Sequence, residues 1–167
     1  MGRAIGAIEG LPVLDLGRRV ADELGTSPDL ALVAVPEADY RRVEARVACQ
    51  VLDHAVAQGA VVALGSGCLG DPRIGLRLEE LRLVHDRSYQ IVALACATRV
   101  LATRNGLDAP RSVALGTVHH QFVQMLHERQ ARCRELADTI IDTSATTPEE
   151  AGEQVIRAVE AGFSQHS

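Results

Sequence analysis

The sequence predicts a three-layer α/β/α fold with a parallel central sheet, formed by one domain over residues 1–167. Short apolar runs alternate with longer amphipathic runs along the whole chain, as strands alternate with helices in α/β proteins. Residues 60–64 and 89–95 are almost continuously apolar, which is typical of parallel strands covered on both faces. A length of 167 residues suits one domain, and we find no repeat, linker or low-complexity tract.

The elements follow in order from these patterns. We expect strands at residues 3–8, 30–35, 60–64, 89–95 and 139–142, and a loop at 107–116. We expect helices at residues 14–24, 38–58, 71–81, 97–103, 118–136 and 148–161. Gly25 and Gly59 follow the first two helices, where glycine commonly ends a helix. Thr147 precedes the last helix as its N-cap, and Glu149 and Glu150 lie in its first turn.

The composition excludes several functions. All 17 basic residues are arginine, so Schiff-base chemistry and phosphate binding by a lysine are excluded. The net charge of -5 gives no reason to expect nucleic acid or an anionic membrane. No apolar run reaches about 18 residues, and we expect a soluble, cytoplasmic protein. The four cysteines form no C-x-x-C pair, so we expect reduced thiols and no structural zinc of that kind.

Several stretches, in order, resemble the shikimate kinase family, which has a P-loop kinase fold. Residues 16–21 resemble its opening helix, and Tyr40-Arg41-Arg42-Val43-Glu44 resembles its aromatic-Arg-x-x-Glu segment. Gly65-Ser66-Gly67 follows an apolar strand, as the family's glycine-triplet loop does. Pro110-Arg111 is similar to its lid, Arg129 to its late substrate-binding arginine, and residues 140–143 to its last strand. The resemblance covers nearly the whole chain.

The resemblance implies transfer of the γ-phosphoryl group of ATP, with magnesium, to a hydroxyl of shikimate. It implies a substrate site, whose positions in this chain are Arg41, Gly65, Ser66, Gly67 and Arg129. It also implies nucleotide or lid positions, which are Gly10, Arg104 and Arg111. We assign no catalytic residue and no metal ligand.

The stretch that matches the phosphate-binding loop lacks that loop's chemistry. A working loop reads G-x-x-x-x-G-K-[ST]: backbone N–H groups and the lysine bind the phosphates, and the hydroxyl binds the metal. Here Gly10 remains, but Pro12 takes the place of the second glycine and has no N–H. Val13 takes the lysine position, and Leu14 and Asp15 take the hydroxyl positions. The sequence therefore predicts a degenerate Walker A loop.

Other candidates are weaker. Between Gly25 and Tyr40 the chain is shorter than the family's usual segment, and Asp29 is its one acidic candidate, with a plain loop aspartate as the alternative. Arg41 and Arg42 are alternatively exposed residues paired with Glu37, Asp39 or Glu44. His119, His120 and His127 lack a recognisable third metal ligand. Cys68 follows Gly67, but G-x-S-x-G is absent.

These features lead to a shikimate-kinase-like pseudoenzyme without phosphotransfer as the main hypothesis. It would act by binding a partner protein or a small carboxylate ligand, in aromatic amino-acid biosynthesis, with no cofactor. One alternative is a divergent shikimate kinase in which Arg18 or Arg19 replaces the lysine, with ATP and magnesium as cofactors. A second alternative is a structural or assembly subunit, working as an oligomer.

Overall fold

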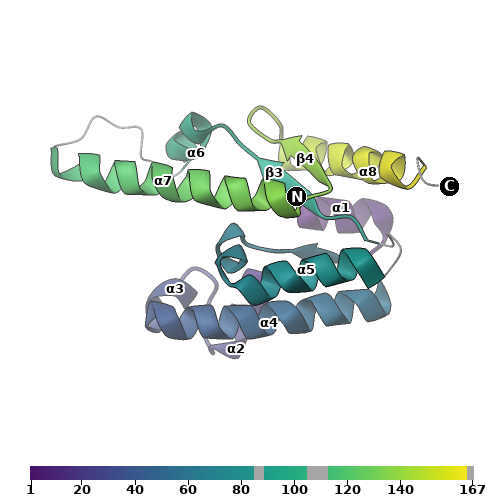
Figure 1. Cartoon of the computed structure of the whole chain (residues 1–167), viewed down its shortest axis with the longest axis horizontal. Coiled ribbons are helices and arrows are strands. Elements are labelled where there is room, and N and C mark those ends of the chain that lie inside the picture. Colours follow the sequence, from purple (N-terminus) through teal and green to yellow (C-terminus); the bar gives the residue numbers. More distant parts are fainter. Residues whose placement is uncertain (85–88, 105–112, 165–167) are drawn as a thin grey trace. The chain divides into compact units, whose positions relative to one another are not determined.

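The protein is an α/β protein with parallel strands, as expected. The computed structural model describes residues 1–84, 89–104 and 113–164, and they form two compact units, Met1–Tyr89 and Gln90–Ser167 (Figure 1). Each unit contains one pair of parallel strands. The two units are described separately below, and the expectation of a single domain stays a prediction.

The first unit pairs strands β1 (Val13–Asp15) and β2 (Val61–Ala63) in parallel, with Leu14 opposite Val62. The chain begins with helix α1 (Gly2–Glu9), and β1 leads into α2 (Leu16–Glu23). After the short α3 (Ala31–Ala34), the long α4 (Glu37–Gln58) leads to β2. A 3₁₀ turn, η1 (Ser66–Gly70), and α5 (Pro72–Val84) complete the unit.

Helix α4 organises the core of the first unit. It contacts α2, β2, η1 and α5. The largest fully buried side chains belong to elements that pack around it: Leu16, Val20, Cys68 and Ile74. Ion pairs join α4 to its neighbours, from Arg46 to Glu23 at 2.8 Å and from Asp53 to Arg77 at 2.5 Å. Because α4 is packed on several sides, the positions of the residues that it carries are fixed.

Two expected strands are wrong. Residues 3–8 lie in helix α1, and residues 31–34 form helix α3. In α1, Gly6 allows the helix to pack closely against β1, because a side chain at that position would overlap Val13. Short apolar runs of about six residues fit either a strand or a buried helix turn, so their pattern alone did not decide.

The other expected helices and strands of the first unit are present with small shifts. The helix expected from residue 14 begins at Leu16, because Leu14 lies in β1. Gly25 adopts a left-handed φ of 64° after α2, and its N–H donates to the carbonyl of Asp22, as expected for a glycine that ends a helix. The expected helix over 38–58 is confirmed within one residue.

The second unit pairs β3 (Val92–Ala95) with β4 (Thr139–Asp142) in parallel. Its helices are α6 (Thr98–Arg104), α7 (Val113–Leu136) and α8 (Pro148–Ser164). Helix α7 starts earlier than expected, since residues 113–116 of the expected loop are helical; residues 107–112 lie outside the described part of the chain. Thr147 caps α8 as expected: its Oγ1 accepts from the N–H of Glu150 at 3.2 Å, and the Glu150 carboxylate accepts from the N–H of Thr147 at 2.8 Å.

Over the described ranges, no helix has both the length and the apolar character needed to cross a membrane.

Candidate functional site

The structure brings Arg41 to the glycine turn that follows β2. Arg41 lies in the second turn of α4, and two residues separate the end of β2 from the start of η1. The buried Cys68 holds η1 against α4. The Arg41 guanidinium lies so close to Gly67 that a Cβ atom there would be 2.7 Å from Nη1. Gly65 and Ser66 belong to the same turn and are exposed. Four positions expected in a substrate site therefore lie together at the carboxyl end of a parallel strand.

A buried carboxylate fixes the orientation of Arg41. Its Nη1 donates to Oε2 of Glu44 at 2.8 Å, and the Glu44 side chain is only 8% exposed. Its Nη2 lies 3.5 Å from Oε1 of Glu37. The Arg41 side chain is 34% exposed, so it combines partners within the protein with access to solvent. The neighbouring Arg42 differs, because it is 73% exposed and pairs with Asp39.

Tyr40 completes the surroundings of Arg41. Its ring is buried, with its centroid 5.4 Å from Cζ of Arg41. Burial, and then the negative charge of Glu44, raise the pKa of the Tyr40 phenol. Burial alone would lower the pKa of Arg41, but the hydrogen bond and charge of Glu44 reverse that effect and raise it. The result is a permanently charged, oriented guanidinium beside an open glycine turn, which suits a carboxylate.

The residues matched to a phosphate-binding loop form regular structure instead. Gly10 ends α1 with a φ of 66°, and the carbonyl of Pro12 accepts a hydrogen bond from the N–H of Val61. Val13 and Leu14 lie in β1, paired with β2. Asp15 is both the last residue of β1 and the N-cap of α2, where its Oδ1 accepts from the N–H of Arg18 at 3.2 Å. Leu16, the first residue of α2, directly follows Asp15, so no loop separates the strand from the helix.

The remaining predicted residues lie in the second unit. Arg104 binds at the carboxyl ends of both strands: Nη2 donates to the carbonyl of Thr143 at 3.3 Å, and Nη1 lies 3.7 Å from Sγ of Cys96. Arg129 lies half-buried on α7 near Cys133, whose thiol pKa is raised by burial and lowered in part by Arg129. Arg111 lies outside the described residues.

The structure provides no further support for the weaker candidates. Asp29 is exposed in the turn before α3. His120 and His127 lie exposed on α7, and the side chain of His119 lies outside the described residues. Among the side chains that the structure describes, no group of three histidine, cysteine, aspartate or glutamate residues is arranged to hold a metal ion.

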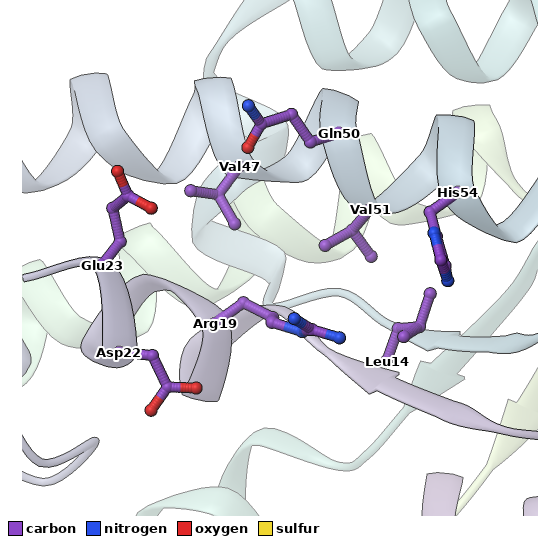
Figure 2. Close-up of a pocket in the computed structure, with 8 residues that line it drawn as sticks. All are labelled: Leu14, Arg19, Asp22, Glu23, Val47, Gln50, Val51 and His54. Atoms are coloured by element: carbon purple, nitrogen blue, oxygen red, sulfur yellow. The ribbon is translucent and has the colours of Figure 1, made fainter.

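Sequence reasoning missed a groove of about 420 Å³ between α2 and α4. Figure 2 shows the side chains that line it, which come from β1, α2 and α4: Leu14, Arg19, Asp22, Glu23, Val47, Gln50, Val51 and His54. Residues from three elements form no motif along the chain. Only the helical spacing of Val47 and Val51 gave any signal, and it indicated only a buried helix face.

The parallel α/β architecture, with an exposed glycine turn at a strand end, matches the P-loop kinase fold of solved shikimate kinases. The shikimate kinase family model matches residues 1–160, and the chain belongs to the shikimate kinase family.

Individual relatives agree with this assignment. The chain is 28% identical over 161 residues to a shikimate kinase of Thermobifida fusca (strain YX), covering 96% of this chain and 87% of that protein. Two solved structures share the fold. One is the shikimate kinase from Acinetobacter baumannii in complex with shikimate, with a TM-score of 0.69 and 16% identity over 96% of this chain and 85% of that one. The other is the shikimate kinase from Bacteroides thetaiotaomicron, with a TM-score of 0.68 and 17% identity over 95% and 89% of the two chains.

Proposed function

We propose that this member of the shikimate kinase family binds a small carboxylate through Arg41 and the glycine turn, and that it does not transfer phosphate from ATP. One observation carries the second half of the proposal. Strand β1 passes directly into α2 at Asp15, where the family's catalytic members need a phosphate-binding loop.

Three features of this junction act against ATP binding. Residues 13–15 are extended and paired in register with β2, so this stretch does not form the curved backbone that wraps a phosphate. The Asp15 carboxylate already occupies the N–H of Arg18 and would repel a phosphate there. Val13, at the matched lysine position, has no charge. Losing one oriented cation in phosphoryl transfer lowers the rate on the order of 10³-fold, and here several groups are lost together.

The carboxylate half of the proposal rests on Arg41. Its guanidinium has five N–H donors, of which Glu44 and Glu37 engage only a part. Shikimate is the ligand of the Acinetobacter baumannii structure, and it carries one carboxylate, so it is the first ligand to test. A guanidinium that a buried glutamate orients would bind such a group in two parallel hydrogen bonds.

Titration calorimetry with shikimate tests this half. We expect the unmodified chain to bind shikimate and the Arg41→Ala variant to bind it at least about tenfold more weakly, because a charge-assisted pair is lost. Arg42→Ala is the matched control: the neighbouring arginine pairs with Asp39 and should leave the affinity unchanged. Equal losses in both variants, or no binding of shikimate by the unmodified chain, would refute the carboxylate site.

Shikimate kinase activity is the second candidate, and the comparisons favour it over a protein without activity. The family model and the Thermobifida fusca relative carry that name over nearly the whole chain. In this case Arg18 or Arg19, in the first turn of α2, would replace the missing lysine. A coupled assay with ATP, magnesium and shikimate decides between the candidates: turnover that Arg18→Ala or Arg19→Ala abolishes establishes the kinase, and absence of turnover removes it.

Binding of a partner protein, oligomer formation and a role in aromatic amino-acid biosynthesis remain predictions. The exposed Leu76 and Leu83, seven residues apart on α5, form the apolar surface that would be mutated first if the carboxylate test fails.

A further inference from the structure

Aliphatic side chains form the floor of the groove between α2 and α4. Leu14, Val47 and Val51 form it, and each is no more than 6% exposed. The volume of about 420 Å³ lies within the range of small-molecule sites, about 300–1,000 Å³. The floor belongs to β1 and α4, two elements of the packed core, so its shape is fixed by the fold.

A guanidinium and an imidazole lie at one end of this groove. Figure 2 shows the Arg19 side chain extending along the groove toward Leu14, and the ring of His54 pointing from α4 toward the same residue. Within the described part of the chain, neither Arg19 nor His54 has a recorded hydrogen bond or ion pair from its side chain. A guanidinium and an imidazole directed at one point, beside apolar surface, would bind an anion.

The acidic residues that line the groove do not point into this end. Glu23 lies at the opposite end and is paired with Arg46 at 2.8 Å. Asp22 points away from α4 (Figure 2). The Arg19 guanidinium is therefore the charged group at the Leu14 end.

We infer that this groove is a second ligand site, which binds a small monocarboxylate with an apolar body. The carboxylate binds Arg19 and His54, and the apolar body covers Val47 and Val51. A carboxylate with an apolar body fits better than inorganic phosphate, because the body can also cover the aliphatic side chains that line the groove. This site is distinct from the Arg41 site: thirteen residues separate Arg41 from His54 on α4, or about 20 Å along the helix. The inference does not depend on the proposed function.

The test uses hexanoate as the probe and follows backbone amide signals of the full-length chain by NMR. We expect hexanoate to shift the amides of Val47, Val51 and His54, and to bind at least about tenfold more tightly than acetate. Hexanamide, which has the same chain without the charge, should bind at least about tenfold more weakly than hexanoate. Hexanoate that binds no better than hexanamide or phosphate would overturn the inference without any mutation.

Matched variants locate the site. Arg19 is exposed, so Arg19→Gln should fold normally, as a thermal melt can check, and should weaken hexanoate binding about tenfold. Arg42→Gln, another exposed arginine that lines no part of the groove, should leave it unchanged. Arg41→Ala should lose shikimate binding and keep the hexanoate shifts. If hexanoate binding survives Arg19→Gln, or disappears with Arg41→Ala, the groove is not the site.

Discussion

Arg41 lies so close to Gly67 that its guanidinium fits there only because position 67 has no side chain. A Cβ atom at position 67 would be 2.7 Å from Nη1 of Arg41, inside any normal contact distance. The three nearest atoms that it would meet all belong to that guanidinium, which is the far end of a flexible side chain. Gly67 therefore sets where the guanidinium can lie.

Substitution of Gly67 should impair ligand binding more than folding. We expect Gly67→Ala to displace Arg41 and weaken shikimate binding about tenfold, equivalent to about 1.4 kcal/mol. The free energy of unfolding should change by less than about 1 kcal/mol, since a surface side chain can move aside. Calorimetry with shikimate and urea denaturation measure the two effects.

Gly70 provides the control for this experiment. It lies in the same turn η1, and a Cβ there meets no atom within 4 Å. Gly70→Ala should leave shikimate binding unchanged. If both variants bind as the unmodified chain does, Arg41 is not held at the glycine turn in the way described.

The packing of α1 on β1 predicts a difference between two helical glycines. A Cβ at Gly6 would overlap Val13 and come within 2.8 Å of the carbonyl oxygen of Leu11, so Gly6→Ala should destabilise the fold by about 1–3 kcal/mol. Gly17 lies exposed in α2 with its nearest atom at 3.5 Å, and Gly17→Ala should stabilise the fold by up to about 1 kcal/mol. Denaturant unfolding of both variants checks this. Equal effects would contradict the helical assignment of α1 and its contact with β1.

The raised pKa of Tyr40 predicts a loss of stability in alkali. Burial and Glu44 hold the phenol protonated in the folded state, while the unfolded chain ionises near its usual pKa of about 10. Ionisation therefore favours the unfolded state, and this contribution to stability, complete below about pH 10, falls as the pH rises further. Tyr40→Phe cannot ionise, so its free energy of unfolding should decline less between pH 9 and pH 11 than that of the unmodified chain. Parallel declines would show that Tyr40 ionises freely in the folded state.

The cap of α8 is predicted to stabilise the second unit. Thr147→Ala removes the hydroxyl that accepts from the N–H of Glu150 and should cost about 1 kcal/mol. Hydrogen bonds from Thr147 lower the pKa of Glu150, so this cap is complete above the ordinary pKa of a glutamate and weakens as the pH falls through the lowered value. Thermal unfolding of the variant measures the loss.

Thr146→Val is the control for the cap. The Thr146 hydroxyl is buried and, within the described residues, has no hydrogen-bond partner, so its removal should be neutral or stabilising. A Thr146→Val variant as unstable as Thr147→Ala would assign the effect to packing rather than to the cap.

The sequence predicted long, regularly patterned elements well. Helix α4 was expected within one residue of its bounds, because Val47 and Val51 recur at helical spacing and Gly59 follows. β4 was expected with its observed bounds, Thr139–Asp142. The strands predicted from short apolar runs were wrong in α1 and α3. The secondary structure of such runs depends on packing, such as that of Gly6 on Val13, rather than on the apolar pattern.

Some features of the candidate site could be predicted from the sequence and others could not. The Arg41–Glu44 pair is encoded by a spacing of three on one helix, and the resemblance implied that Gly67 would lie nearby. The direct passage of β1 into α2 could not be read from the sequence, because Asp15 fits both a loop and an N-cap. The groove could not be predicted from the sequence either, because Leu14, Arg19 and His54 come to line one groove only after three elements have packed together.

We propose that the β1–α2 junction cannot bind the phosphates of ATP. Titration calorimetry of the unmodified chain with magnesium and ATP tests this without a substrate or a variant. We expect no heat of binding at ATP concentrations up to about the millimolar range, where a Kd of 1 mM corresponds to only about -4 kcal/mol. Saturable binding with a micromolar Kd would contradict the proposal and establish a nucleotide site at this junction or elsewhere in the chain.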